Sequence, residues 1–188
     1  MGWADIRTAK VYNLPPLPYG AYTYRIEQVD RPENDSVHVK FNVEGRTIVS
    51  RLYYDGNLER LLISCGQIKE GNQYLPYMVT NAVGKSGRCI VDQWNGDAGK
   101  INNKIVAYLF PDNTDEKRSV WSVKVKIDAG WKCSSCGSNR NLEAHHIKPV
   151  NLFPELKYDI RNGQCLCRSC HTEWHRIHGW AESGGPGL

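Results

Sequence analysis

Residues 133–175 read CSSCGSNRNLEAHHIKPVNLFPELKYDIRNGQCLCRSCHTEWH and contain two C-x-x-C pairs and four histidines. Each C-x-x-C turn brings two sulfurs together, so two such turns can supply the four thiolates of a closed tetrahedral zinc site. Because a segment this short has little core of its own, bound zinc would contribute much of its folding free energy. The spacing predicts a structural Zn²⁺ ion held by Cys133, Cys136, Cys167 and Cys170.

Two disulfides are the alternative arrangement for these cysteines. The chain has seven cysteines, an odd number, and its first residues, MGWADI, lack the charged and then apolar stretches of an export signal. Both features favour thiolates in a reducing compartment, so we expect a cytoplasmic protein. The remaining cysteines are expected to be ordinary buried thiols: Cys65, Cys89 and Cys165.

The overall composition sets broad limits on fold and partners. A chain of 188 residues with 40% hydrophobic content can form one ordinary domain or two small ones. The formal net charge of +4 permits a nucleic-acid partner without requiring one. No apolar run approaches the roughly 20 residues that a membrane helix needs, so we expect no membrane partner.

The first 128 residues carry the alternating pattern of β-strands. In residues 37–43 apolar and polar side chains alternate, and Glu44-Gly45 then turns the chain into residues 46–54, which predicts a hairpin. Residues 57–65 place leucines on one helical face. Further strands are expected at residues 19–29, 88–94, 104–110 and 119–127. Five or six short strands with one helix favour a small OB-like barrel, so the predicted fold class is α+β, with a mainly-β barrel followed by a small zinc-stapled domain.

Parts of the barrel region resemble phage-encoded single-stranded-DNA-binding-like domains. The matching pieces are Leu-Pro-x-Gly-x-Tyr at residues 17–22, the helix after the hairpin, and Gly84-Lys85 ahead of the next strand. The resemblance implies that exposed aromatic rings stack on unpaired bases while basic side chains contact phosphates. The candidates are Tyr12, Tyr19, Tyr53, Tyr54, Tyr74 and Trp94 for stacking, and Arg46, Arg51, Lys85 and Arg88 for phosphates. The alternative is that these aromatic residues fill the core.

Strand patterning stops near Asp128-Ala129-Gly130, shortly before the first cysteine pair. We therefore expect a domain boundary there. The predicted organisation is an OB-like, single-stranded-DNA-binding domain at residues 1–128, the zinc-stapled domain at residues 129–180, and a flexible tail at residues 181–188.

Several motifs of the C-terminal region agree in order and spacing with one known family. The first C-x-x-C is followed by His145-His146-Ile-x-Pro, then by Asn162 five residues before the second C-x-x-C, and finally by Cys-His171-x-x-x-His175. This order resembles the HNH endonucleases of the ββα-metal fold. The resemblance implies metal-dependent hydrolysis of DNA phosphodiester bonds, leaving 3′-hydroxyl and 5′-phosphate ends.

The same resemblance suggests a role for each polar side chain. His171 and His175 lie four residues apart on a helix expected at residues 169–178, so both imidazoles share one face and can bind one divalent ion together with His145. His146 points to the other face of its strand and is left as the general base. Asn162 would fix the loop at residues 150–160. The candidates for phosphate contacts in this region are Lys148, Arg168 and Arg176.

An all-histidine ligand set resembles the nuclease colicins, whereas many relatives carry Asp at the position of His145. Imidazole favours Zn²⁺ or Ni²⁺, while Mg²⁺ or Mn²⁺ is the expected ion in the cell. The sequence leaves open whether the DNA is duplex or single-stranded and which oligomeric state the chain adopts. An origin in a phage or mobile element is expected. Two other functions remain: a non-catalytic single-stranded-DNA-binding protein with a zinc knuckle, and a sequence-specific homing or restriction nuclease.

Overall fold

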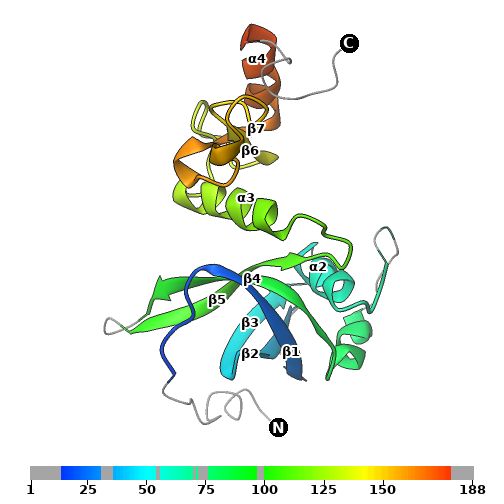
Figure 1. Ribbon diagram of the computed structural model, residues 1–188. Coiled ribbons are helices and arrows are strands. Elements are labelled where there is room, and N and C mark those ends of the chain that lie inside the picture. The colour runs from blue at the N-terminus through cyan, green and yellow to red at the C-terminus, as the bar shows by residue number, and fades with distance from the viewer. Residues whose placement is uncertain are drawn as a thin grey trace. The chain divides into compact units, whose positions relative to one another are not determined.

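The computed structural model describes residues 14–30, 36–53, 56–69, 71, 76–96 and 100–178. The predicted tail at residues 181–188 and three of the stacking candidates, Tyr12, Tyr54 and Tyr74, lie outside the described residues. The chain forms two compact units, Met1–Thr114 and Asp115–Leu188, which are drawn in Figure 1. Within the described residues, no helix has the length and apolar character that crossing a membrane requires.

The first unit is built on a five-stranded antiparallel sheet with the strand order β3-β2-β1-β4-β5. Its two edge strands, β3 and β5, contact each other, so the sheet curls into a nearly closed barrel. The strands are β1 (Gly20–Asp30), β2 (Ser36–Val43), β3 (Arg46–Tyr53), β4 (Ser86–Asn95) and β5 (Ile101–Leu109).

Local chemistry explains the predicted hairpin and helix of this unit, and both are confirmed. Glu44 and Gly45 connect β2 to β3 with φ angles of 49° and 76°, the left-handed pair that a two-residue hairpin turn requires. Helix α2 (Gly56–Ser64) follows β3 and buries Leu58, Leu61 and Leu62 completely. These leucines join Tyr24 and Phe41 in the barrel core. A 3₁₀ segment, η1 (Pro76–Ala82), leads into β4.

The prediction of a strand at residues 119–127 is wrong, because this segment is part of helix α3 (Glu116–Asp128). The alternation of valines there suggested a strand, but Trp121 and Val125 lie one helical turn apart and are both buried. Asp115 caps the helix by accepting a hydrogen bond from the backbone N–H of Arg118 at 2.9 Å. Helix α3 belongs to the second unit, so the chain divides ahead of this helix rather than after residue 128.

The second unit is a short β-hairpin packed between two helices (Figure 1). Strand β6 (Leu142–His146) pairs antiparallel with β7 (Gly163–Cys167), and the connecting loop contains η3 (Pro154–Leu156) and η4 (Ile160–Asn162). Helix α3 covers one face through Trp121 and Val125. Helix α4 (Arg168–His178) contributes Trp174 to a cluster with Leu166. The predicted α+β class, a barrel-like sheet followed by a small cysteine-rich domain, is confirmed.

Candidate metal centres and active site

The four cysteines of the two C-x-x-C pairs converge. The sulfurs of Cys133, Cys136, Cys167 and Cys170 all lie within 4.8 Å of one another. Cys136 Sγ and Cys167 Sγ, from different pairs, are 3.6 Å apart. Tetrahedral zinc with bonds of about 2.3 Å separates its sulfurs by about 3.8 Å, whereas a disulfide bond is about 2.05 Å long. All seven cysteines are free thiols, so the group fits zinc and not the disulfide alternative.

Backbone hydrogen bonds shape the first cysteine turn. Gly137 has φ of 74° and donates its N–H to the Cys133 carbonyl at 2.9 Å, which turns the chain back on itself. Ser134 donates its N–H to the Cys165 carbonyl at 2.8 Å and so attaches this turn to β7. Burial acts to raise the pKa of the Cys133 thiol, but backbone hydrogen bonds from the cysteine turns outweigh it and lower the pKa to about 6. The turn therefore favours the thiolate that a metal binds.

Three histidines form a second group of potential metal ligands. His171 Nε2 lies 3.0 Å from both His145 Nδ1 and His175 Nε2. His171 and His175 share one face of α4, and His145 comes from the hairpin strand β6. A tetrahedral ion bound at about 2.1 Å spaces its nitrogens by about 3.4 Å. The three imidazoles therefore fit one divalent cation after a movement of a few tenths of an ångström.

Burial favours the neutral form of His145 and His175, the form that metal ligation requires. Burial and then the adjacent His171 and His175 lower the pKa of His145 to about 4. Burial and His171 also lower the pKa of His175. Within the described part of the chain, His145 Nε2 is buried and has no hydrogen-bond partner. A bound cation would offset the cost of packing these rings together.

Glu143 is a functional candidate that the sequence analysis missed. Its Oε2 lies 2.5 Å from His171 Nδ1, so a neutral His171 carries its proton on Nδ1 and directs the Nε2 lone pair toward the other two imidazoles. A carboxylate in this position orients a metal-binding histidine and makes it a better ligand. The available signal was the spacing, because Glu143 stands two residues before His145 and shares its face of β6.

His146 lies outside the histidine group and has a different environment. Its ring stacks on the indole of Trp121, with the centroids 4.0 Å apart and the planes 4° from parallel. His146 Nε2 lies 2.9 Å from the Lys157 carbonyl oxygen. Because a carbonyl can only accept, Nε2 carries the proton and Nδ1 keeps the lone pair. Burial, together with the positive charges of Arg118 and Lys157, lowers the pKa of His146 against the opposing effect of that carbonyl.

Asn162 spans the loop between the two hairpin strands. Its Nδ2 donates to the carbonyls of Lys148 at 3.1 Å and Leu156 at 3.3 Å, and its Oδ1 accepts the Lys148 N–H at 2.8 Å. The side chain is buried, so these bonds are shielded from water. Asn162 therefore holds the start and the middle of the loop that carries the Lys157 carbonyl.

The predicted phosphate contacts differ in their surroundings. Lys148, Arg168 and Arg176 are all exposed. Arg176 forms a two-pronged ion pair with Glu173 at 2.7 and 2.8 Å, and the Lys148 ammonium lies 5.2 Å from the centroid of the Phe153 ring. Arg168 stands at the first position of α4.

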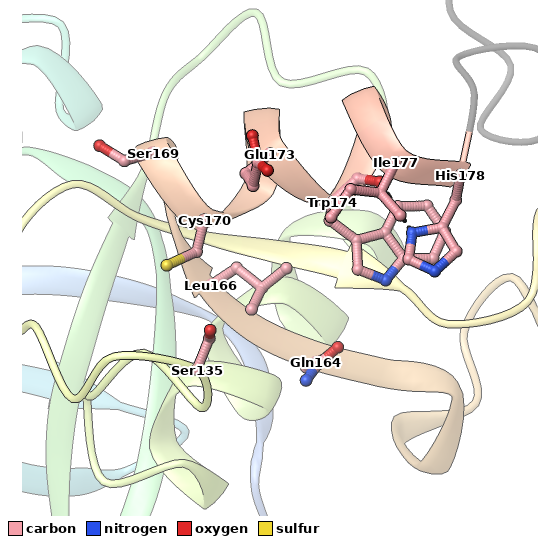
Figure 2. A pocket seen from close by; sticks show the side chains of 9 residues that line it. All are labelled: Ser135, Gln164, Leu166, Ser169, Cys170, Glu173, Trp174, Ile177 and His178. Carbon is pink, nitrogen blue, oxygen red and sulfur yellow. Dashed lines mark hydrogen bonds between the residues drawn. The ribbon is translucent and has the colours of Figure 1, made fainter.

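A pocket of about 500 Å³ lies along α4, between this helix and β7 (Figure 2). Leu166, Trp174 and Ile177 supply its apolar lining. Trp174 also contacts the histidine group, because its ring centroid is 4.2 Å from that of His145. The His178 ring stacks on Trp174 at 4.4 Å, as the overlapping rings in Figure 2 show. Trp174 is therefore packed between two imidazoles.

The thiolate and imidazole groups are two candidate metal sites, and one known family covers both of them. Residues 133–176 match the family model described as HNH endonuclease. The match runs from the first cysteine turn through β6, the loop and β7 into α4, and so includes both groups of potential metal ligands. No curated protein matches the chain.

Proposed function

We propose that the chain is a DNA endonuclease in which His145, His171 and His175 bind one divalent cation and His146 acts as the general base. The observation that carries the proposal is that two adjacent histidines of β6 have different surroundings. His145 points its Nδ1 into the three-histidine group, while His146 is held outside it, neutral, with its proton on Nε2.

The residues of the chain supply the proton transfers and the orientation. The bound cation would stabilise negative charge on the phosphate and on the departing oxygen. His146 Nδ1 removes a proton from water, the water oxygen attacks phosphorus, and the bond to the 3′-oxygen breaks. The Lys157 carbonyl stabilises the imidazolium that forms, because it accepts a hydrogen bond from the Nε2–H group throughout. Solvent protonates the 3′-oxygen and then removes the proton from His146. Cys133, Cys136, Cys167 and Cys170 would hold a structural zinc ion.

Cleavage of a plasmid and of a single-stranded circle across Mg²⁺, Mn²⁺, Zn²⁺ and Ni²⁺ tests this proposal. His146→Ala should lower the cleavage rate by at least about 100-fold while zinc content and DNA affinity stay unchanged. Thr172→Ala, a change at an exposed position of α4 outside the three-histidine group, is the control and should cut like the wild type. A His146→Ala variant as active as the wild type would overturn the base assignment. Absence of cleavage by the wild type with every metal would favour the binding-only alternative.

The first unit is proposed to bind single-stranded DNA and to bring it to the nuclease domain. The strand order, the contact between β3 and β5, and the helix between β3 and β4 support the OB-like interpretation. Tyr53 and Trp94 are about half exposed, and the Arg51 guanidinium lies 5.2 Å from the Tyr53 ring centroid. An aromatic ring beside a cation suits a base stacked next to its phosphate.

Fluorescence titration with a labelled oligonucleotide tests this second part. Tyr53→Ala and Trp94→Ala should each weaken binding about tenfold, given the usual contribution of one stacked base. Ile101→Ala removes another exposed apolar side chain of this unit and should leave affinity unchanged. Equal affinity of all variants would contradict the proposed binding face.

A further inference from the structure

Helix α3 lies outside the segment that matches the HNH family, yet it contacts the general base proposed above. Trp121, on the buried face of α3, is only 3% exposed and stacks flat on His146. Its Nε1 donates to the Asp159 carbonyl at 2.9 Å, which fixes the indole against the loop. One face of the His146 ring is thus covered by an aromatic plane that is itself held in place.

The N-terminal end of α3 holds the other contact of His146. Asp115, the capping residue, accepts hydrogen bonds from the Lys157 ammonium at 3.2 Å and from the Tyr158 hydroxyl at 3.1 Å. Lys157 is also the residue whose backbone carbonyl faces His146 Nε2. The helix therefore contacts the ring through Trp121 and the loop that determines its tautomer through Asp115.

The hairpin is shaped to receive this helix. Gly163 pairs with His146 across β6 and β7. A Cβ atom at Gly163 would lie 2.2 Å from Val125 Cγ2 and 3.1 Å from Trp121 Cζ2. Any larger residue at this position would push α3 away from the hairpin, so the close approach of the helix depends on glycine.

We propose that α3 is a functional part of the nuclease site and that Trp121 is a positioning residue that sets the ring plane of His146. The inference rests on the proposed role of His146 as base. A flat aromatic contact resists rotation of the imidazole, so Nδ1 stays aimed at the water that it must deprotonate. An aliphatic side chain at this position has no flat face and would leave the ring free to turn.

The experiment compares Trp121→Leu, Trp121→Phe and Lys117→Ala in the full chain, with the cysteine group loaded with zinc and saturating Mn²⁺ or Mg²⁺ for the kinetics. Because a small misplacement of a reacting group costs up to about 100-fold, Trp121→Leu should lower kcat by about 10- to 100-fold with little change in KM. Trp121→Phe keeps an aromatic face and should recover most of the rate. Lys117→Ala, on the exposed side of α3, should match the wild type.

A spectroscopic readout separates positioning from the chemistry of the base. In the zinc-loaded protein without a second metal, the indole should shift the His146 ring protons upfield in the NMR spectrum. Trp121→Leu should remove that shift, whereas Trp121→Phe should retain part of it. Loss of the shift with a wild-type kcat would overturn the positioning role, and so would an equal loss of rate in the Leu and Phe variants. Failure of the base assignment itself would appear separately, as an active His146→Ala variant.

If Trp121→Leu loses its zinc, Gly163→Ala provides the second variant. It displaces α3 from the hairpin while the indole remains present, and it should lower kcat and reduce the His146 shift together. A Gly163→Ala protein with a reduced shift and unchanged kcat would also overturn the proposal.

Discussion

Replacing Glu143 tests whether an outer carboxylate prepares His171 to bind metal. Glu143→Gln keeps the size of the side chain and removes its charge, and Glu143→Ala removes the acceptor altogether. Loss of such a partner commonly weakens metal binding by about 10- to 100-fold. Here the side chains of Glu143 and His171 are 42% and 24% exposed, so solvent screens the contact and places the effect near the lower limit. We expect about tenfold weaker binding for Glu143→Ala, or about 1.4 kcal/mol, and a smaller loss for Glu143→Gln.

The assay is calorimetric titration of Ni²⁺ into protein whose cysteine group already holds zinc, so that only the histidine group binds. Glu173→Gln is the matched control, because Glu173 is an exposed carboxylate on α4 that pairs with Arg176 instead of a histidine. Its Kd should equal that of the wild type. A Glu143→Ala variant that binds Ni²⁺ as tightly as the wild type would show that the 2.5 Å contact does not tune His171.

Two further outcomes follow from the metal groups. Zinc removal by a chelator should unfold the second unit, while the first unit with its own barrel core keeps its β signal in circular dichroism; protection of residues 115–178 from protease after chelation would contradict this. Acid should also destabilise the second unit, because the unfolded chain takes up a proton on His145 at its ordinary pKa of about 6.5 and the folded chain only at about 4. The stabilisation from neutral His145 is therefore complete above a pH of about 6.5 and is lost as the pH falls toward about 4. The free energy of unfolding of the second unit, measured in urea at pH 7 and pH 5, should change less with pH in His145→Gln than in the wild type. An equal change in both proteins would show that His145 does not cause the pH dependence.

The pairs of candidate metal ligands could be predicted because the spacing within each pair is local information. Two residues between paired cysteines, and three between His171 and His175, place the side chains together in almost any turn or helix. The same holds for Glu44-Gly45, whose left-handed backbone suits a tight hairpin. The contacts around the proposed base have no such local signature, as Trp121 lies well before the first cysteine turn.

Sequence alone determined which side chains could bind metal and which faces of short segments were apolar, since both depend on neighbours within one or two turns. Tertiary structure decided that the alternating valines of residues 119–127 form a helix. In the helix Trp121 and Val125 pack together on Cys165, and burying these side chains stabilises the chain more than an unpaired strand would. It also decided that Glu143 meets His171 and that Trp121 meets His146. Such contacts exist only after the hairpin and both helices have closed on one another, so no local pattern encodes them.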